Sequence, residues 1–389
     1  MRIRYPLLGA ALLGPLFGFA ISAAGAEAKG FTVLHNFAGP PNDGSYPYNN
    51  VTLDGSGDIL GASNLGGGSN NGTIFEIAPD GTETVLYSFA GGSKGSDPNG
   101  GVTLDPATGN LYGTTTFGGG NGCRNGCGVL YELAANGTYS VLQEFNPASD
   151  GQWPVGTLVR DSAGNLYGVA GGGGANNGGT AFEYSAKGKF SVLHAFGGSD
   201  GFQPVGNLLL DKKGNLYGAT NSGGADQYGT VFELSAKGKL TTLYTFTGGN
   251  DGGYPTGGLA MDKSGNLYGA TNLAGNGSTP YGTVYELSPK GTLTTLYAFQ
   301  GGNDGGWPAG NVLEIQGNVY GTTTSGGANQ DGTVYEVDVA ARSETVLHSF
   351  DGNDGLVPES GLVMKRNHLY GTAGGGGADN LGVVYSLKK

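Results

Sequence analysis

Cysteine, tryptophan, methionine and histidine are all scarce in this sequence: among 389 residues there are two, two, three and four of them. Two thiols without neighbouring histidines make a poor zinc site. His35, His194 and His348 share one position of a repeated phrase, so we do not expect the histidines to converge on a metal or a nucleophile. The HExxH, P-loop and EF-hand patterns are absent as well. We therefore expect no cofactor, no metal and no enzymatic activity. The absence of linear motifs is weaker evidence against an enzyme, because the active sites of propellers are assembled from several blades.

Positive charge is also scarce. Lysine and arginine total 19 against 31 aspartates and glutamates, which gives a formal net charge of −12 at pH 7. Such a surface repels nucleic acid and anionic lipid. We expect neither nucleic acid nor, after removal of the signal segment, a membrane as partner.

The long apolar run is confined to the N-terminus, "MRIRYPLLGAALLGPLFGFAISAAGAEA". Two arginines precede the run, and small residues follow it in an A-x-A arrangement at Ala24, Ala26 and Ala28. This pattern predicts a secretory signal peptide over residues 1–28 and a secreted or periplasmic product. A retained membrane anchor is the alternative, because the run approaches spanning length although Pro15 interrupts it.

The two cysteines lie four residues apart in "GGGNGCRNGCGVLYE". In an exported chain, Cys123 and Cys127 are predicted to form a local disulfide. The bond would stiffen one loop.

Glycine, in contrast, is abundant, with 81 residues, and the chain repeats itself. The phrase "TVLHNF" and its relatives recur at spacings of 50 to 56 residues and end at Phe37, Phe89, Phe145, Phe196, Phe246, Phe299 and Phe350. Each period holds four short segments rich in aliphatic, aromatic and β-branched residues, separated by glycine-containing turns. Four antiparallel strands in about fifty residues are typical of a propeller blade.

The chain starts with a lone outer strand, "FTVLHNF", and its last repeat stops after a third strand, "GVVYSLKK". Pairing these two segments would complete a ring and remove two open sheet edges, whereas a solenoid would need capping repeats. We predict an all-β, seven-bladed β-propeller of four-stranded antiparallel blades over residues 31–389. Its blades span about 48–89, 99–145, 155–196, 205–246, 256–299, 309–350, and 359–389 with 31–37.

The repeated wording "GNLYGTT…GG…GTVYEL…G…TLYxF" resembles the GloVer tandem-repeat family of bacterial exported proteins, described as having a choice of anchor. The resemblance covers residues 31–389 and implies no defined catalytic residues. Family members often carry a C-terminal surface anchor, but this sequence ends at Lys389 directly after a strand. We therefore expect a released product.

Two long glycine-rich loop types fall on one face of the predicted ring, which we call the long-loop face, and the tight hairpins fall on the opposite hairpin face. Loops on rigid scaffolds commonly carry function. One loop type contains an aspartate that either builds a turn or contacts ligand, as at Asp150, Asp251 and Asp304. The residue before the following proline is often aromatic, at Tyr46, Trp153, Tyr254 and Trp307. Such rings either plug the seam between blades or stack on a sugar.

Two charged residues interrupt the apolar pattern of the inner strands, Arg160 and Glu314. They either reach water at a strand end or orient a ligand in the central channel. For a metal in that channel, Asn207, Asn311 and Glu359 are the other plausible ligands.

We expect an exported, non-catalytic binding or scaffold propeller that recognises carbohydrate or another exported protein on its long-loop face. One alternative is an extracytoplasmic metal-assisted hydrolase, lyase or lactonase with a central-channel site. Another is a structural spacer in a cell-surface assembly. The sequence does not specify the oligomeric state.

Overall fold

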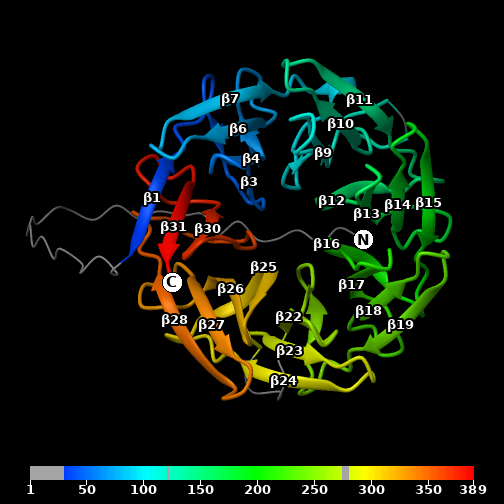
Figure 1. Ribbon diagram of the computed structural model, residues 1–389, viewed down its shortest axis with the longest axis vertical. Coiled ribbons are helices and arrows are strands. Elements are labelled where there is room, and N and C mark those ends of the chain that lie inside the picture. Colours follow the sequence, from blue (N-terminus) through cyan, green and yellow to red (C-terminus); the bar gives the residue numbers. More distant parts are fainter. Residues whose placement is uncertain (1–29, 121, 274–279) are drawn as a thin grey trace, which may run out of the picture.

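Seven antiparallel sheets stand around a common axis in the computed structural model, which describes residues 30–120, 122–273 and 280–389 (Figure 1). The predicted all-β, seven-bladed propeller is confirmed. The predicted signal peptide, residues 1–28, lies outside the described residues. Helical structure in the described residues is limited to one 3-10 turn, η1 (Gly92–Lys94). No helix in these ranges is long and apolar enough to cross a membrane.

The first three blades have four strands each, which follow one another from the axis to the rim. Blade 1 consists of β3 (Thr52–Leu53), β4 (Ile59–Ser63), β6 (Thr73–Ile77) and β7 (Glu83–Ser88). Blade 2 consists of β8 (Thr103–Leu104), β9 (Leu111–Thr115), β10 (Val129–Leu133) and β11 (Tyr139–Glu144). Blade 3 consists of β12 (Gln152–Arg160), β13 (Leu166–Gly172), β14 (Thr180–Tyr184) and β15 (Phe190–Ala195). A separate two-stranded sheet is formed by β2 (Gly44–Ser45) and β5 (Leu65–Gly66).

The remaining blades follow the same order, except that the inner strand of blade 5 is split in two. Blade 4 consists of β16 (Phe202–Leu210), β17 (Leu216–Ser222), β18 (Thr230–Leu234) and β19 (Leu240–Thr245). Blade 5 consists of β20 (Gly253–Pro255), β21 (Ala260–Met261), β22 (Leu267–Leu273), β23 (Thr283–Leu287) and β24 (Leu293–Ala298). Blade 6 consists of β25 (Gly306–Ile315), β26 (Asn318–Ser325), β27 (Thr333–Asp338) and β28 (Ser343–Ser349). Blade 7 consists of β29 (Val363–Lys365), β30 (His368–Ala373), β31 (Val383–Lys388) and β1 (Phe31–Asn36).

Blade 7 is completed by the two ends of the described chain, as predicted. Strand β1 runs antiparallel to β31, with Phe31 opposite Leu387 and Asn36 opposite Val383. In Figure 1 the blue β1 lies beside the red β31 at the rim. This pairing closes the ring and rules out an open solenoid.

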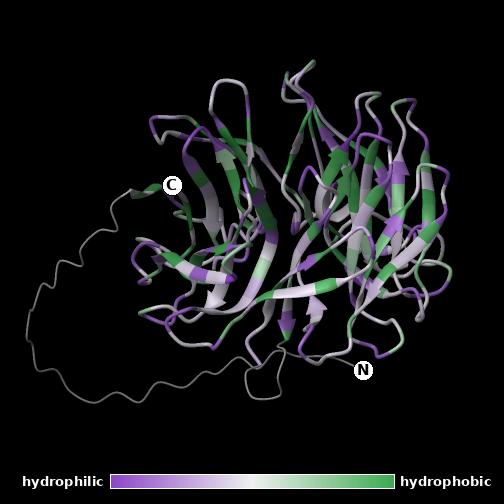
Figure 2. Ribbon diagram, turned by 60° about the horizontal axis from the view of Figure 1, so that its bottom comes forward, coloured by the Kyte–Doolittle hydropathy of each residue, from purple (hydrophilic) through white to green (hydrophobic). Residues whose placement is uncertain are grey.

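The core lies between neighbouring sheets rather than in one central mass. The phenylalanine that ends each outer strand is at most 1% exposed in all seven copies. Figure 2 shows hydrophobic stretches within the strands and many hydrophilic residues in the loops. Each of the seven apolar clusters combines residues of two neighbouring blades, so every blade packs its apolar side chains on the blade beside it.

A glycine and a proline join each blade to the next on the long-loop face. The glycines adopt φ values of 91° to 102°, and a Cβ on any of them would lie 2.4 to 2.7 Å from the Cδ of the next blade's proline. Their carbonyls accept the N–H of the buried phenylalanines at 2.9 to 3.1 Å. Glycine is required for both the backbone conformation and the contact. The seven glycines are Gly72, Gly128, Gly179, Gly229, Gly282, Gly332 and Gly382.

At the axis the inner strands touch through backbone. A Cβ on Gly257 would lie 1.7 Å from the carbonyl oxygen of Gly310. The Asn207 side chain accepts the N–H of Thr157 at 2.6 Å, and the Asn311 side chain accepts the N–H of Gly258 at 2.5 Å. The asparagines considered as channel ligands thus hold neighbouring blades together.

Candidate functional site

One loop position on the long-loop face has an unusual backbone in every blade. The residue before the seam proline has φ between 53° and 57°, and its N–H donates to a carbonyl in a loop of the preceding blade at 2.8 to 3.0 Å. Positive φ is uncommon for a residue with a side chain and is a marked outlier for valine. The seven residues are Tyr46, Asp97, Trp153, Gln203, Tyr254, Trp307 and Val357.

The two tryptophans at this position point to solvent. Trp153 is 41% exposed and Trp307 is 42% exposed. The proline and glycine fill the seam, so these indole rings do not plug it. The indole N–H of Trp307 donates to the carbonyl of Pro280 at 3.1 Å, which fixes the ring in place.

Further aromatic rings pair with this position on blades 4 to 6. Tyr228 lies 5.4 Å from Tyr254 in an edge-to-face contact, and Tyr281 lies 5.7 Å from Trp307. A Cβ on Gly248 or Gly301 would lie 2.4 to 2.5 Å from the ring of Tyr228 or Tyr281. The two "GGNDGG" copies therefore leave room for a tyrosine of the preceding loop.

A concave site of about 480 Å³ lies on the long-loop face between blades 1 and 2. Tyr46 and Tyr48 form one side as nearly parallel rings, 6.2 Å apart with an interplanar angle of 11°. The half-buried Asp97 accepts a hydrogen bond from the Asn64 amide at 2.7 Å, and burial raises the pKa of Asp97. Phe117 contributes a third ring. Aromatic faces beside amide and carboxylate groups suit a polar ligand with flat apolar surfaces.

This site adjoins a smaller axial pocket of about 240 Å³, and both are lined by Tyr48. Burial, and then the nearby Glu359 carboxylate, raise the pKa of Tyr48. The corresponding residues of blades 3 and 4 are Val155 and Val205. Tyr48 is thus a departure from the repeat, and the sequence pattern alone gave no reason to prefer it.

The predicted loop aspartates already have hydrogen-bond donors. The Asp150 carboxylate accepts from Gln143, Asp251 accepts from the Tyr244 hydroxyl and Asp304 accepts from the Tyr297 hydroxyl, each at 3.0 Å. Each also accepts a backbone N–H at the start of its own loop, at 2.8 to 3.2 Å. Histidine, tyrosine and glutamine alternate at this outer-strand position because each supplies a donor. Contact of these aspartates with a ligand stays a prediction.

The two charged inner-strand residues have partners near the hairpin face. The Arg160 guanidinium pairs with the buried Asp105 of blade 2 at 3.0 Å. Glu314 accepts the N–H of Gly317 at 2.8 Å within its own turn. Their role toward a ligand also stays a prediction.

The predicted disulfide is present between Cys123 and Cys127. The Cys127 carbonyl accepts the N–H of Trp153 at 2.9 Å, and the Cys123 sulfur lies 3.0 Å from the Gln152 side chain. The bond therefore restrains the loop against which Trp153 is positioned.

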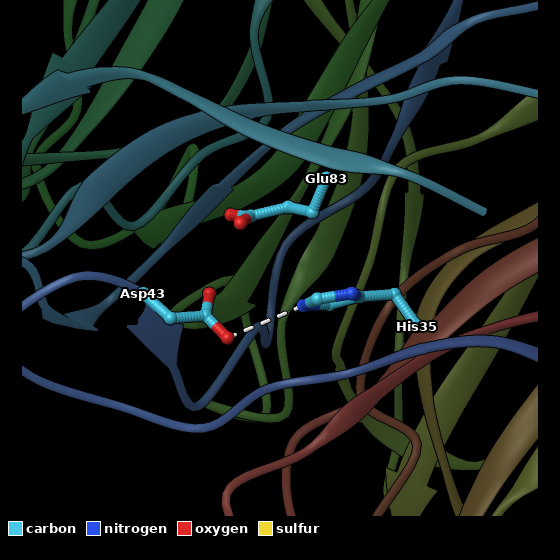
Figure 3. Close-up of side chains that lie close together, drawn as sticks. All are labelled: His35, Asp43 and Glu83. Carbon is cyan, nitrogen blue, oxygen red and sulfur yellow. Dashed lines mark hydrogen bonds and ion pairs between the residues drawn. The ribbon is translucent and has the colours of Figure 1, made fainter.

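A cluster that the sequence did not reveal lies at the rim where the ring closes. His35 of β1, Asp43 of the next loop and Glu83 of β7 have potential ligand atoms all within 4.8 Å of one another (Figure 3). Burial opposes ionisation of Asp43, but hydrogen bonds from His35 and from backbone amides lower its pKa. Burial, and then the Asp43 charge, raise the pKa of Glu83 to about 7. The only available signal was a glutamate at a position where blades 3, 4, 5 and 7 carry Phe190, Leu240, Leu293 and Phe31.

Glu344 of β28 occupies the equivalent place in blade 6, facing Asp304. Burial, and then the Asp304 charge, raise the pKa of Glu344 to about 7 from 4.5. The folded state therefore holds this proton more tightly, and stability falls as the pH rises from about 4.5 to about 7. We expect the stability advantage of Glu344→Leu over wild type to be about 1–2 kcal/mol larger at pH 8 than at pH 5, discounted because the side chain is half-exposed. Leucine occupies the same register in blades 4 and 5, at Leu240 and Leu293.

Urea unfolding of both proteins at the two pH values measures this difference. A stability gap between variant and wild type that does not change with pH would contradict it.

Comparison with known proteins identifies a matching repeat family and solved structures of similar fold. A family model described as the Gloeobacter/Verrucomicrobia repeat matches residues 14–212 and 206–389. A search of curated proteins found no match. Among solved structures, virginiamycin B lyase from Staphylococcus aureus is similar at a TM-score of 0.62 and 14% identity, over 92% of this chain and 99% of that chain.

The extracellular domains of BT3049 and BT4673 from B. thetaiotaomicron, assigned to the hybrid two-component systems, have TM-scores of 0.55 and 0.56 at 13% identity. Each match covers 92% of this chain but only 41% of the BT3049 chain and 42% of the BT4673 chain. At these identities the likeness shows the propeller fold alone. The family model, in contrast, covers nearly the whole sequence, in agreement with the resemblance of the repeats, and the chain therefore belongs to the Gloeobacter/Verrucomicrobia repeat family.

Proposed function

We propose that this protein is an exported, non-catalytic propeller whose long-loop face binds carbohydrate. The observation that carries the proposal is the pre-proline position. Among the described residues the chain places glycine at 49 positive-φ positions, yet none of the seven pre-proline copies is glycine. A side chain is kept there at a backbone cost of about 1 kcal/mol each, and four of the seven are aromatic.

The site between blades 1 and 2 provides the complementary chemistry. The parallel rings of Tyr46 and Tyr48 offer apolar faces to a sugar ring, and Asp97 and Asn64 offer acceptors and donors to its hydroxyls. Trp153 and Trp307, on the same face, would extend the contact to a longer chain.

The enzymatic alternative needs carboxylate, amide or imidazole groups that are free at the axis. Asn207 and Asn311 are instead bonded to backbone amides of other blades, which leaves Glu359 as the one carboxylate among the described residues that line the axial pocket. We therefore favour binding over metal-assisted hydrolysis, elimination or lactone opening in the channel.

Two observations support export. The chain contains a disulfide, which persists in oxidising compartments. Structures of similar fold include extracellular domains.

The test is binding of residues 30–389 to soluble cell-wall and plant-type glycans, measured by thermal shift and then by titration calorimetry. The repeats supply tolerated replacements: Tyr48→Val copies blades 3 and 4, while Tyr46→Gln and Trp307→Gln copy Gln203. We expect each aromatic replacement to weaken glycan binding about tenfold, since one stacked ring contributes about 1–1.5 kcal/mol.

Gln203→Ala serves as the matched control, because it alters the same backbone position without removing a ring. Equal weakening by Gln203→Ala and Trp307→Gln would show that the aromatic rings are not the contact. No binding of any glycan would overturn carbohydrate recognition and favour a protein partner or a spacer role.

A further inference from the structure

The seam between blades 7 and 1 brings an imidazole and two carboxylates together. The Nε2 atom of His35 lies 3.3 Å from Oδ2 of Asp43, and Glu83 reaches toward both from the opposite strand (Figure 3). His35 is 16% exposed and Asp43 is 12% exposed at the side chain. Oε1 of Glu83 is buried and has no hydrogen-bond partner among the described residues. An unpaired buried carboxylate oxygen requires a proton or a cation.

The groups around this oxygen are already oriented. The Asp43 carboxylate accepts the N–H of Ala38 on Oδ2 at 2.7 Å and that of Gly44 on Oδ1 at 2.5 Å. Because Oδ2 also faces Nε2 of His35, the free lone pair of this carboxylate is on Oδ1. The His35 ring packs edge-to-face on Phe37, with ring centroids 4.8 Å apart. Both side chains are thus held before any ligand arrives.

The other seams provide an internal comparison, because each has the same three positions. Two of them pair histidine with aspartate but place an apolar residue third: His194 with Asp200 and Leu240, and His348 with Asp354 and Phe31. The seam between blades 5 and 6 has the glutamate but a tyrosine in place of histidine: Tyr297 with Asp304 and Glu344. Among the described residues, only the closing seam combines imidazole with two carboxylates.

We propose that His35, Asp43 and Glu83 bind one divalent transition-metal ion of the Zn²⁺ class. One nitrogen and two carboxylate oxygens suit Zn²⁺, Mn²⁺ or Co²⁺ better than Ca²⁺, which takes six to eight oxygens. Tetrahedral ligands about 2.0–2.2 Å from Zn²⁺ lie roughly 3.4 Å apart. The His35 and Asp43 atoms already have this spacing, at 3.3 Å, and the wider ligand spacings, up to 4.8 Å, need to close by up to about 1.4 Å. The ion neutralises two facing carboxylates, and water completes its coordination.

The three ligands come from β1, which completes blade 7, from the loop after it, and from β7 of blade 1. A bound ion therefore links the N-terminal strand to blade 1 and stabilises the closed ring. This role is structural and independent of ligand binding on the long-loop face.

The experiment is calorimetric titration of metal-free residues 30–389 with Zn²⁺, together with thermal unfolding. We expect one equivalent to bind, a rise in Tm that EDTA reverses, and visible absorption of bound Co²⁺ that reports nitrogen and oxygen ligands. His35→Tyr copies blade 5 and Glu83→Leu copies blades 4 and 5, so both variants should fold. Each is expected to weaken Zn²⁺ binding at least 100-fold.

His194→Tyr and Glu344→Leu are the matched controls and are expected to bind Zn²⁺ like wild type. The proposal is overturned if wild type binds no Zn²⁺, or if His35→Tyr and Glu83→Leu bind it as tightly as the controls do.

Discussion

A chain that begins at residue 39, and so lacks strand β1, is expected not to form a stable monomeric propeller. Strand β1 provides the outer strand of blade 7 and five paired positions on β31. Its loss exposes the edge of β31, a template for association with other chains. It also removes Phe37, which is 0% exposed in the intact ring. Deleting one buried phenylalanine side chain typically costs about 3–5 kcal/mol, which is a large part of the stability of a domain.

The measurement compares chains that start at residue 30 and at residue 39 by size-exclusion chromatography and denaturant unfolding. A synthetic peptide of residues 30–38 is expected to bind the shortened chain and restore part of its stability. Phe37→Ala in the full-length ring is expected to lower the free energy of unfolding less than the truncation does, because strand β1 is kept. A shortened chain that remains monomeric, with unchanged unfolding, would show that the closing strand contributes nothing.

Gly257→Ala is expected to destabilise the ring by about 3 kcal/mol or more. The added Cβ would lie 1.7 Å from the Gly310 carbonyl oxygen and 2.3 Å from its carbonyl carbon. Backbone of the next blade cannot move aside without opening the seam, so this overpacking falls at the upper end of its usual cost. Gly257 has no positive φ, so the effect is one of contact and not of backbone strain.

Gly55→Ala is the control, because a Cβ there meets no atom within 4 Å and the backbone has no positive φ. It is expected to leave the free energy of unfolding within about 0.5 kcal/mol of wild type, the usual range for surface changes. Equal midpoints for the two variants in urea unfolding would refute close contact of the inner strands at the axis.

The repeat made the architecture predictable. Seven phrases ending in phenylalanine, four extended segments in each period and a split last blade predicted the closed ring, because hydrophobic alternation and turn residues act locally and recur in every copy. The disulfide between Cys123 and Cys127 was predictable for the same reason: its partners are four residues apart.

The sequence predicted which face of the ring carries the candidate functional surface, but not how the residues on that face are arranged. The aromatic residues before proline could be found in the sequence, but their positive φ and the exposure of Trp153 and Trp307 depend on a hydrogen bond to the preceding blade. The sequence of a single repeat also does not show that the outer-strand histidines, tyrosines and glutamine donate hydrogen bonds to the loop aspartates.

The sequence by itself therefore determined the blade, the number of blades and the way the ring closes, since each depends on neighbouring residues or on recurrence. Only the tertiary structure decided which side chains of different blades meet. Tyr48 and Asp97 line one concave site across one seam, and His35 and Glu83 come together across another. Such contacts form between residues about fifty positions apart, where packing of adjacent sheets sets the distance and no local pattern records it.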